Sequence, residues 1–291
     1  GQNLGWFFQQ WVELPHIPDL TVSWSHSKEV LRIVIKQKIS EEQPLYTLPI
    51  EVEVGSDTEV THHKDWMDSQ SIQISIPMKN APRYVAFDPQ KSVLAKITYQ
   101  QDASVWEAQL SSTSAHARLD AIYGLKESKG AKELEAVLGD TSKHVVLRRV
   151  AASQLGELGE GARIIQGLKA KHAAVRLASI RALSKTVYKE ALPKLLKHYK
   201  NDDNVQVRGA ALDCIAALDP EEALSLARKE LQNRTLHRGM LYDMLSVFRR
   251  HGTLGDIPKI LAYGKRHGVR ATVLWSTIPI LEREALGSKR N

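Results

Sequence analysis

The chain has 291 residues, of which 43% are hydrophobic and 25% are charged, enough apolar material for about two ordinary globular domains. Its single cysteine, Cys214, excludes disulfide frameworks and cysteine-based zinc sites. No apolar run reaches the length of a membrane span, and the first residues lack the pattern of a signal peptide. These features favour the cytoplasm slightly but leave the compartment unknown.

Charge is distributed unevenly along the sequence. Residues 1–110 contain 9 Lys and Arg against 14 Asp and Glu, a net charge of −5. Residues 111–291 contain 31 against 19, a net charge of +12. This change of composition indicates two domains, and the basic half raises the question of an anionic partner such as nucleic acid.

An aromatic cluster near the N-terminus predicts a short helix that needs cover. Trp6, Phe7, Phe8 and Trp11 fall within six residues. At about 100° per residue they and their apolar neighbours span an arc much wider than the ~100° stripe of a surface helix. Two prolines before residue 19 end the helix. We therefore expect residues 1–18 to form an aromatic helix and junction that packs against another domain.

From residue 19 onward apolar residues alternate with polar ones, which predicts β-strands. The rows expected to face a core are Leu20, Val22 and Trp24; Leu31, Ile33, Ile35, Gln37 and Ile39; Tyr46, Leu48, Ile50, Val52 and Val54; and Ile72, Ile74, Ile76 and Met78. Shorter strands are predicted at RYVAFDP and SVLAKITY.

Two polar residues in these strands carry specific expectations. Gln37 lies on an inward row, so its amide should bond buried backbone groups. Glu53 lies on an outward row and should face water. With turn-forming residues between the runs, the pattern predicts a small antiparallel β-sandwich over residues 19–107.

Residues 108–291 repeat themselves at intervals of 30, 28, 32, 30 and 32 residues. Each repeat is marked by an arginine that begins a helical pattern: Arg118, Arg148, Arg176, Arg208, Arg238 and Arg270. Apolar or small residues lie four and seven places after each of the first five. A second apolar pattern precedes each of these helices. The sequence therefore predicts antiparallel helix pairs stacked into an α-solenoid.

This pattern resembles HEAT repeats. The resemblance implies that an aspartate from the preceding turn meets the repeat arginine, and Asp140 and Asp203 occupy such places. Two roles for the arginine row remain open. It ties neighbouring repeats together, or it forms an anion-binding groove.

The order of aromatic helix, β-sandwich and helical solenoid is similar to that in the aminopeptidase N family of zinc peptidases. The stretches that carry this resemblance are NLGWFFQQWVELPHIPDLTVSW, PLYTLPIEVEV and VAFDPQKSVLAKI, within about residues 3–100. The resemblance implies a non-catalytic C-terminal region that braces a catalytic domain of the same polypeptide and walls its peptide-substrate chamber. Trp6, Phe7, Phe8 and Trp11 would then contact that catalytic domain.

The chain itself carries no recognisable catalytic motif. None of its 11 histidines begins an H-E-x-x-H zinc motif, and neither a G-x-S-x-G elbow nor a G-x-x-x-x-G-K-[ST] loop is present. We therefore expect no catalytic residue, metal ligand or cofactor site in this chain. Zinc would belong to the catalytic domain that the resemblance implies.

Two alternative functions remain. A relative that has lost catalysis would serve as an interaction scaffold, and a HEAT-type solenoid with a charge of +12 could bind nucleic acid. The basic residues are spread through the repeats and few aromatic residues lie among them for base stacking. We therefore do not expect a nucleic-acid partner, and we expect no membrane partner.

Overall fold

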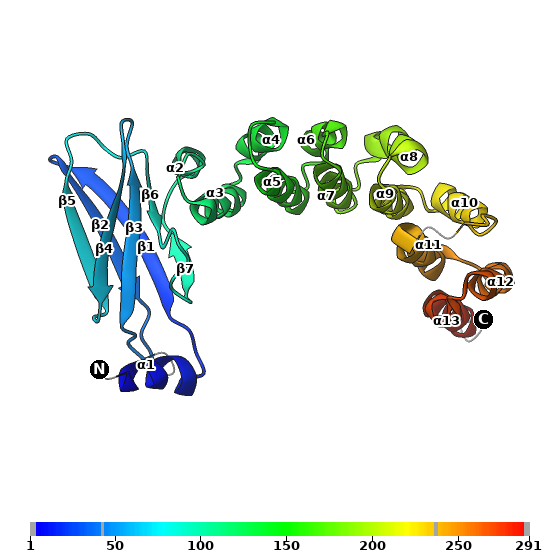
Figure 1. Ribbon diagram of the computed structural model, residues 1–291, viewed down its shortest axis with the longest axis horizontal. Helices are drawn as coiled ribbons and strands as arrows, with labels where there is room; N and C mark the ends of the chain where they lie inside the picture. Colours follow the sequence, from blue (N-terminus) through cyan, green and yellow to red (C-terminus); the bar gives the residue numbers. More distant parts are fainter. Residues whose placement is uncertain (1–3, 42–43, 236–237, 288–291) are drawn as a thin grey trace. The chain divides into compact units, whose positions relative to one another are not determined.

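The computed structural model describes residues 4–41, 44–235 and 238–287 and separates into two compact units, Gly1–Gly130 and Ala131–Asn291. The first unit contains two β-sheets and the second contains stacked helices (Figure 1). The predicted fold class, a small β-sandwich followed by a HEAT-like solenoid, is confirmed. Among the described residues, no helix is both long and apolar enough to span a membrane.

The predicted domain limits remain predictions, and two observations bear on them. In the structure, the helices over residues 103–127 belong to the same compact unit as the strands. The sequence pattern instead assigned residues 108–127 to the helical repeats. Residues 1–3 of the predicted N-terminal segment and residues 288–291 of the predicted helical region lie outside the described residues.

Over its described residues, the first unit begins with a short helical segment and continues as seven strands and two helices. Its elements are α1 (Gly5–Phe8), η1 (Gln9–Glu13), β1 (Asp19–Ser27), β2 (Val30–Gln37), β3 (Leu48–Gly55), β4 (Val60–Met67), β5 (Ser71–Pro77), β6 (Tyr84–Phe87), β7 (Lys96–Tyr99), α2 (Ala103–Gln109) and α3 (Ala115–Glu127). One sheet has the strand order β5-β2-β1-β7 and the other has the order β4-β3-β6.

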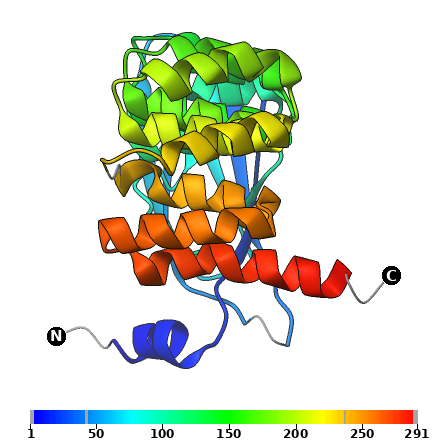
Figure 2. The same ribbon diagram turned by 90° about the vertical axis from the view of Figure 1, so that its right-hand side faces the viewer.

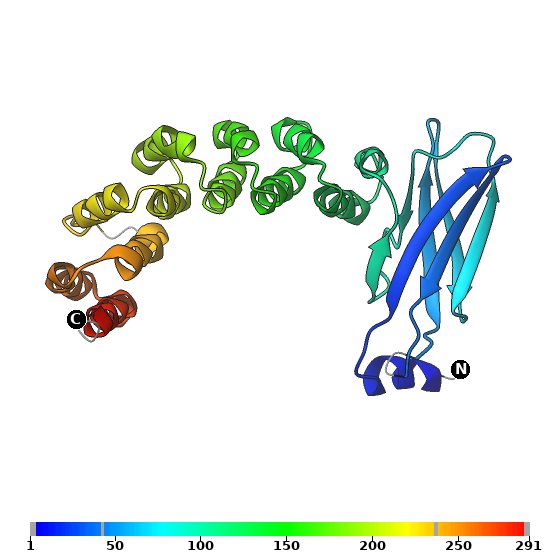
Figure 3. The same ribbon diagram turned by 180° about the vertical axis from the view of Figure 1, so that it is seen from behind.

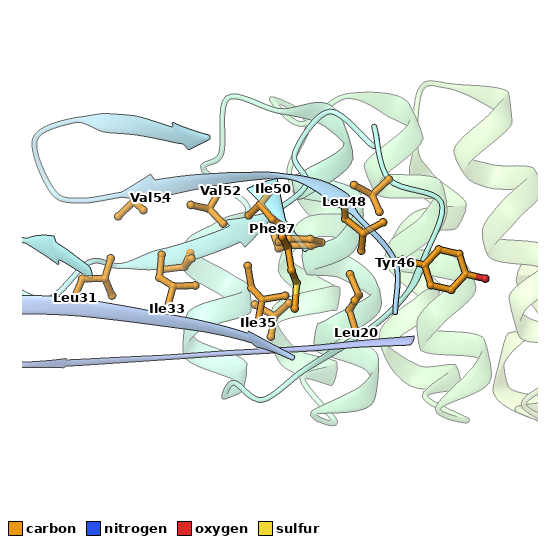
Figure 4. Close-up of a cluster of buried hydrophobic side chains, with 14 residues drawn as sticks. Leu20, Leu31, Ile33, Ile35, Tyr46, Leu48, Ile50, Val52, Val54 and Phe87 are labelled. Atoms are coloured by element: carbon orange, nitrogen blue, oxygen red, sulfur yellow. The ribbon is translucent and has the colours of Figure 1, made fainter. Parts of the chain in front are cut away.

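The alternating apolar rows of the two sheets face each other and form the core. Figure 4 shows Leu20, Leu31, Ile33 and Ile35 from one sheet opposite Leu48, Ile50, Val52, Val54 and Phe87 from the other, all buried. Side chains that alternate along a strand point to opposite faces of its sheet, so a period of two places every second residue in the core. The predicted rows are confirmed, except for one residue at the end of β2.

Gln37 and Ile39 show where the inward row of β2 ends. The Gln37 amide donates to the Tyr46 carbonyl (2.6 Å) and accepts from the Tyr46 N–H (3.1 Å), as predicted. Ile39 was predicted to face the core, but it is exposed. The reason is that β2 ends at Gln37, so the alternation no longer applies two residues later.

Glu53 was predicted to face water, but it is buried. Its carboxylate accepts hydrogen bonds from the hydroxyls of Tyr84 (2.8 Å), Ser112 (2.5 Å) and Thr113 (2.9 Å). The outer face of its sheet is covered by α2 and the start of α3, which pack on β6. A buried carboxylate is tolerated here because three hydroxyl donors replace water.

Strand β7 differs from the antiparallel expectation because it pairs in parallel with β1. Asp19 lies opposite Lys96 and Val22 lies opposite Tyr99. The chain crosses from β6, in the other sheet, before it enters β7, so it can arrive in the same direction as β1. Figure 3 shows β7 beside β1 at the edge of the sheet.

The second unit contains five helix pairs among its described residues. Its elements are α4 (Ala131–Gly139), α5 (Val145–Glu157), α6 (Gly161–Ile164), η2 (Ile165–Lys169), α7 (Ala173–Leu183), η3 (Lys189–Ala191), α8 (Leu192–Asn201), α9 (Val205–Leu218), α10 (Pro220–Glu230), α11 (Arg238–His251), η4 (Leu254–Asp256), α12 (Ile257–His267) and α13 (Arg270–Gly287).

These helices form two rows. The inner row contains α5, α7, α9, α11 and α13, in which each helix packs on the next, and α4, α6, α8, α10 and α12 form the outer row (Figure 1). Figure 2 shows the helices of this unit stacked side by side along their lengths. The helices that contain VRLASIRAL and VRGAALDCI lie side by side, since α7 packs on α9.

Local signals in the sequence explain where several of these helices begin and end. The Asn204 side chain accepts hydrogen bonds from two N–H groups in the first turn of α9. Pro220 opens α10 after Asp219, whose carboxylate accepts from the Glu222 N–H. Gly268 ends α12 in the left-handed conformation (φ 70°) that favours glycine. Helix pairs of this kind become stable by stacking on their neighbours.

Candidate interaction surface

The N-terminal aromatic residues lie on an exposed surface of the first unit. Trp6, Phe7 and Phe8 are 42%, 43% and 55% exposed, and Trp66 of β4 is 58% exposed beside them. Their rings meet edge to face, with centroids 5.9 Å apart for Trp6 and Phe7 and 6.4 Å apart for Trp6 and Trp66. We define these four residues together with Val12, which is also exposed, as the aromatic surface.

The segment that presents this surface is anchored on its opposite side. The buried Gln10 amide donates to the Thr47 carbonyl (3.0 Å) and accepts from the Thr47 N–H (2.8 Å). Trp11 packs against Tyr46 with ring centroids 5.6 Å apart, and the Tyr46 hydroxyl donates to the His16 carbonyl (2.7 Å). Figure 1 shows α1 beneath the ends of the strands.

This anchoring separates the four aromatic residues that the sequence grouped together. Trp6, Phe7 and Phe8 share the exposed surface, whereas Trp11 is partly buried against the sandwich core. The π-helical turn η1 lies between the two groups, and such turns often occur at functional sites. A contact between these residues and a catalytic domain remains a prediction.

Sequence reasoning missed Gln10 and Trp66. Gln10 was visible only as one polar residue in a wide apolar arc, and its partner at Thr47 lies 37 residues away. Trp66 lies in β4, whose alternate residues are mostly exposed, so the strand gave no inward apolar row. A tryptophan on such a strand was the one available signal.

We expect the Gln10 anchor to control how the aromatic surface is held. The variant Gln10→Ala loses two hydrogen bonds to Thr47, each contributing about 1 kcal/mol, and leaves the Thr47 backbone groups unpaired. The variant should show altered near-ultraviolet circular dichroism of tryptophan and faster proteolysis within residues 5–13. Gln9→Ala, which changes an exposed neighbour, is the matched control. Identical proteolysis of the two variants would show that Gln10 is not an anchor.

The predicted arginine row is not uniform in its environment. In the first unit, Arg118 donates to the carbonyls of Ser112 (2.6 Å) and Thr113 (3.1 Å). In the second unit, the Arg148 Nε donates to the Leu138 carbonyl (2.9 Å) at the end of α4. These contacts join each arginine to the turn or helix that precedes it.

Arg176 makes the most extensive contacts of the row. Its guanidinium donates to both carboxylate oxygens of Asp202 (2.8 and 2.7 Å), to Asp203 (2.6 Å), and to the carbonyls of Ala170 and Lys171. Burial alone would raise the pKa of Asp202, but hydrogen bonds led by Arg176 hold it well below its usual range. Arg176 therefore ties α7 to the turn before α9.

Of the two aspartates predicted to meet repeat arginines, one pairs with an arginine, and it is the arginine of another repeat. Asp203 precedes Arg208 in sequence but pairs with Arg176 of the preceding repeat. The Asp140 carboxylate instead accepts from the Ser142 N–H (2.8 Å) and hydroxyl (2.6 Å). A turn residue can reach either neighbouring repeat, and sequence spacing does not distinguish the two.

The remaining members of the row are Arg208, Arg238 and Arg270. One Arg208 nitrogen lies 3.5 Å from the Met240 sulfur, and its Nε is buried without a hydrogen-bond partner in the described part of the chain. Arg238 and Arg270 are exposed. The row therefore combines buried and exposed guanidinium groups, and its role in anion binding remains a prediction.

A basic cleft of about 480 Å³ lies in the second unit beside α8. It is lined by Lys169, Lys194 and Lys197 together with Arg176 and Asp202. The three lysines are exposed, and the described lining contains no Phe, Tyr or Trp; its one aromatic ring, His198, lies 2.9 Å from the Asp202 carboxylate through Nδ1. Arg176 already directs its donors to aspartates and carbonyls, so the free cationic groups here are surface lysines.

The histidines and acidic residues do not assemble into a metal site in the part of the chain that the structure describes. No group of three His, Cys, Asp or Glu side chains is placed to hold a metal ion within residues 4–41, 44–235 and 238–287. The one cysteine, Cys214, is buried in α9, and burial raises the pKa of its thiol to about 12.

Comparison with known proteins agrees with this architecture. The pattern of HEAT repeats matches residues 131–216 and 161–237. No curated protein sequence matches the chain. Among solved structures, aminopeptidase A of Legionella pneumophila, in complex with aspartic acid, is 12% identical with a TM-score of 0.60. The match covers 91% of this chain and 40% of the aminopeptidase, so the chain spans well under half of that protein.

A second solved structure is less similar. The complex of CpcE and CpcF of phycocyanin lyase from Nostoc sp. PCC7120 is 20% identical with a TM-score of 0.36, covering 63% of this chain and 88% of that one. The comparisons therefore show HEAT repeats in the second unit and a fold shared with part of an aminopeptidase.

Proposed function

We propose that this chain is a non-catalytic region of a zinc aminopeptidase and that its aromatic surface packs against the catalytic domain of the same polypeptide. The observation that carries the proposal is an exposed aromatic surface on a segment whose other side is fixed to the sandwich by hydrogen bonds between Gln10 and the Thr47 backbone. Exposed apolar patches of this kind mark interaction sites, and buried aromatic anchors dominate interface energies. The fold shared with an aminopeptidase over 91% of the chain supports the choice of partner.

The role of the second unit in this proposal is that of a wall. The inner helices of the solenoid pack on their neighbours and on the outer row, so their exposed residues face the inner side of the curve. Arg149 and Arg181 are two such residues, while Asp213 and Asp243 of the same helix row lie near Arg250 and Arg181. Arginines of this row that are not neutralised by aspartates would favour long substrates with acidic tails, whereas small substrates would not extend to this surface.

Zinc would have to bind elsewhere in the proposed enzyme. Two histidines one helical turn apart, with a third ligand, are needed to hold zinc from one face of a helix. The residues of this chain do not fit that requirement, because H-E-x-x-H is absent from the sequence. The contribution that we propose for this chain is therefore to brace the catalytic domain and to limit the access of peptide substrates.

The two alternatives differ in what supports them. An interaction scaffold would use the same aromatic surface without catalysis nearby. If the coding region extends upstream of Gly1, the presence or absence of an H-E-x-x-H motif there distinguishes the two functions. Nucleic-acid binding has the basic cleft in its favour. The described lining of that cleft has no Phe, Tyr or Trp on which bases could stack, and its one histidine is engaged with Asp202, so we do not propose this function.

The experiment that tests the proposal compares this chain with the longer polypeptide that would contain it. The double variant Trp6→Ser, Phe8→Ser removes two aromatic anchors, each worth about 2 kcal/mol or more at an interface. The melting temperature of the longer protein should fall by several degrees, whereas that of the isolated chain should fall much less, because there the two side chains are about half exposed and lose only their contacts with neighbouring aromatic rings.

Trp275→Ser provides the control, because Trp275 is a similarly exposed tryptophan in the second unit. It should leave the melting temperature of the longer protein nearly unchanged. If the double variant destabilised the isolated chain as strongly as the longer protein, the aromatic surface would be part of this fold rather than an interface.

A further inference from the structure

A groove of about 670 Å³ lies in the first unit between the edge strand β7 and the helices α2 and α3. Ile97, Thr98 and Tyr99 line it from the strand, and Trp106 and Tyr123 line it from the helices. The proposed function does not use this groove. Its two sides differ in kind, because one is a strand edge and the other is a helix surface.

The strand side of the groove presents unpaired backbone groups. The N–H groups of Lys96 and Gln100 donate to carbonyls at Pro18 (2.9 Å) and Val22 (3.1 Å), so these alternate residues point toward β1. Ile97 and Tyr99 therefore point their N–H and C=O groups the other way, toward the groove. Within the described residues, these N–H groups have no backbone hydrogen-bond partner.

A side-chain donor adds to this unpaired edge. The Nε2 of Gln101, which also lines the groove, is buried without a hydrogen-bond partner in the described part of the chain. Unsatisfied buried donors are costly, and a ligand carbonyl would satisfy this one. The N–H groups of the strand edge and the Gln101 amide are therefore donors in the groove that a ligand with carbonyl oxygens could satisfy.

The floor of the groove is aromatic. Tyr99 and Trp106 meet edge to face with ring centroids 5.0 Å apart. Gly124 of α3 allows this arrangement, because a Cβ at that position would lie 2.1 Å from the Trp106 indole. Tyr123 stands half exposed at the side of the groove. These surfaces suit an aliphatic or aromatic side chain.

The charges in the groove favour a ligand that is not acidic. Lys91 forms an ion pair with Asp120 (2.5 Å), and Glu127 is the other charged residue in the lining. Glu127 in turn pairs with Lys126, which lies just outside the lining (2.9 Å). The one lysine of the described lining, Lys91, is already paired with Asp120, so the groove offers an acidic ligand no unpaired cation, whereas a neutral or basic ligand needs none.

We propose that this groove binds an extended peptide segment, which adds to β7 as a further strand and places an apolar side chain over Tyr99 and Trp106. Strand addition explains why unpaired backbone groups, an unpaired amide donor and an aromatic floor occur together. The partner is a neutral or basic peptide with alternating aliphatic residues. The groove is distinct from the aromatic surface and does not depend on a catalytic domain.

A suitable probe is a blocked nine-residue peptide of alternating valine and threonine with a central arginine. Binding is followed by nuclear magnetic resonance of the whole chain, with amide hydrogen exchange as the readout. The N–H groups of Ile97 and Tyr99 should exchange at least tenfold more slowly with saturating peptide. The N–H groups of Thr98 and Gln100, which point toward β1, should change less than twofold.

Two controls locate the binding site. Tyr123→Ala removes one side of the groove and should weaken binding at least tenfold, whereas Tyr242→Ala, which changes a more exposed tyrosine in the second unit, should change it less than twofold. A peptide with proline at alternate positions cannot donate to the strand edge and should not bind. Absence of binding by the first peptide, or protection that does not alternate along β7, would overturn the proposal.

Discussion

Replacing Glu53 with alanine is expected to lower the free energy of unfolding of the first unit by about 3 kcal/mol. The substitution leaves the hydroxyls of Tyr84, Ser112 and Thr113 without their acceptor in a buried site, and each unsatisfied polar group costs about 1–3 kcal/mol. Chemical denaturation followed by tryptophan fluorescence measures the loss. Glu59→Ala, at an exposed position nearby, should cost less than about 0.5 kcal/mol.

The same carboxylate should make the stability of the first unit depend on pH. Burial raises the pKa of Glu53, but hydrogen bonds from Ser112, Tyr84 and Thr113 outweigh burial and lower it below its usual value. A lowered folded-state pKa means that this stabilisation is fully present above the unfolded-state pKa of about 4.3 and is lost as pH falls through the folded-state value.

The isosteric variant Glu53→Gln isolates this effect. It keeps the shape of the side chain and an acceptor oxygen but has no charge to lose. The free energy of unfolding of the unchanged protein should fall more steeply below about pH 4 than that of the variant. Parallel pH profiles for the two proteins would show that Glu53 does not contribute through its ionised form.

Replacing Arg176 with methionine is expected to lower the free energy of unfolding of the second unit by about 3–5 kcal/mol. Asp202 is nearly fully buried, and removing its guanidinium partner leaves a buried carboxylate without its main counter-charge. Arg238→Met, at an exposed position of the same row, should change stability by less than about 0.5 kcal/mol. Urea denaturation of both variants measures the difference.

The double variant Arg176→Met, Asp202→Leu tests whether the loss comes from the uncompensated charge. Removing both charges should recover a substantial part of the stability, because replacing a buried ion pair with apolar residues is often close to neutral. If the double variant instead lost as much free energy of unfolding as the two single variants together, Arg176 and Asp202 would act independently.

The sequence predicted best those features that depend on neighbours within one element. The inward rows of β1, β2 and β3 were predictable because alternation along a strand decides which side chains face the core. Gln37 was predictable for the same reason, since a polar residue on an inward row needs a backbone partner. The period near 30 predicted the helix pairs of the second unit.

Features that depend on distant elements were not predictable in this way. Glu53 alternates as a solvent-facing residue, and it is buried only because residues 103–117 return to cover that face. Asp203 pairs with Arg176, on the repeat before its own, because stacking rather than spacing sets the distance. Gln10 is part of the candidate site through a partner that lies 37 residues away.

The sequence predicted which N-terminal aromatic residues belong to the candidate site, but not which of them are exposed and which are packed on the sandwich. The wide apolar arc predicted that the N-terminal aromatic residues need cover, yet it could not distinguish Trp11, which packs on the sandwich, from Trp6 and Phe8. The groove beside β7 could not be predicted from the sequence either, because the order of strands in the sheet, and not the sequence of one strand, decides which strand edge is unpaired.

The parallel pairing of β1 and β7 has a mechanical consequence. The two strands run side by side in the same direction, so the chain enters the sandwich at one end of the pair and leaves it at the other end. A pull on the polypeptide from both sides therefore slides β7 along β1 in shear. Their hydrogen bonds then carry the load together instead of opening one after another, as they would in a peeled hairpin.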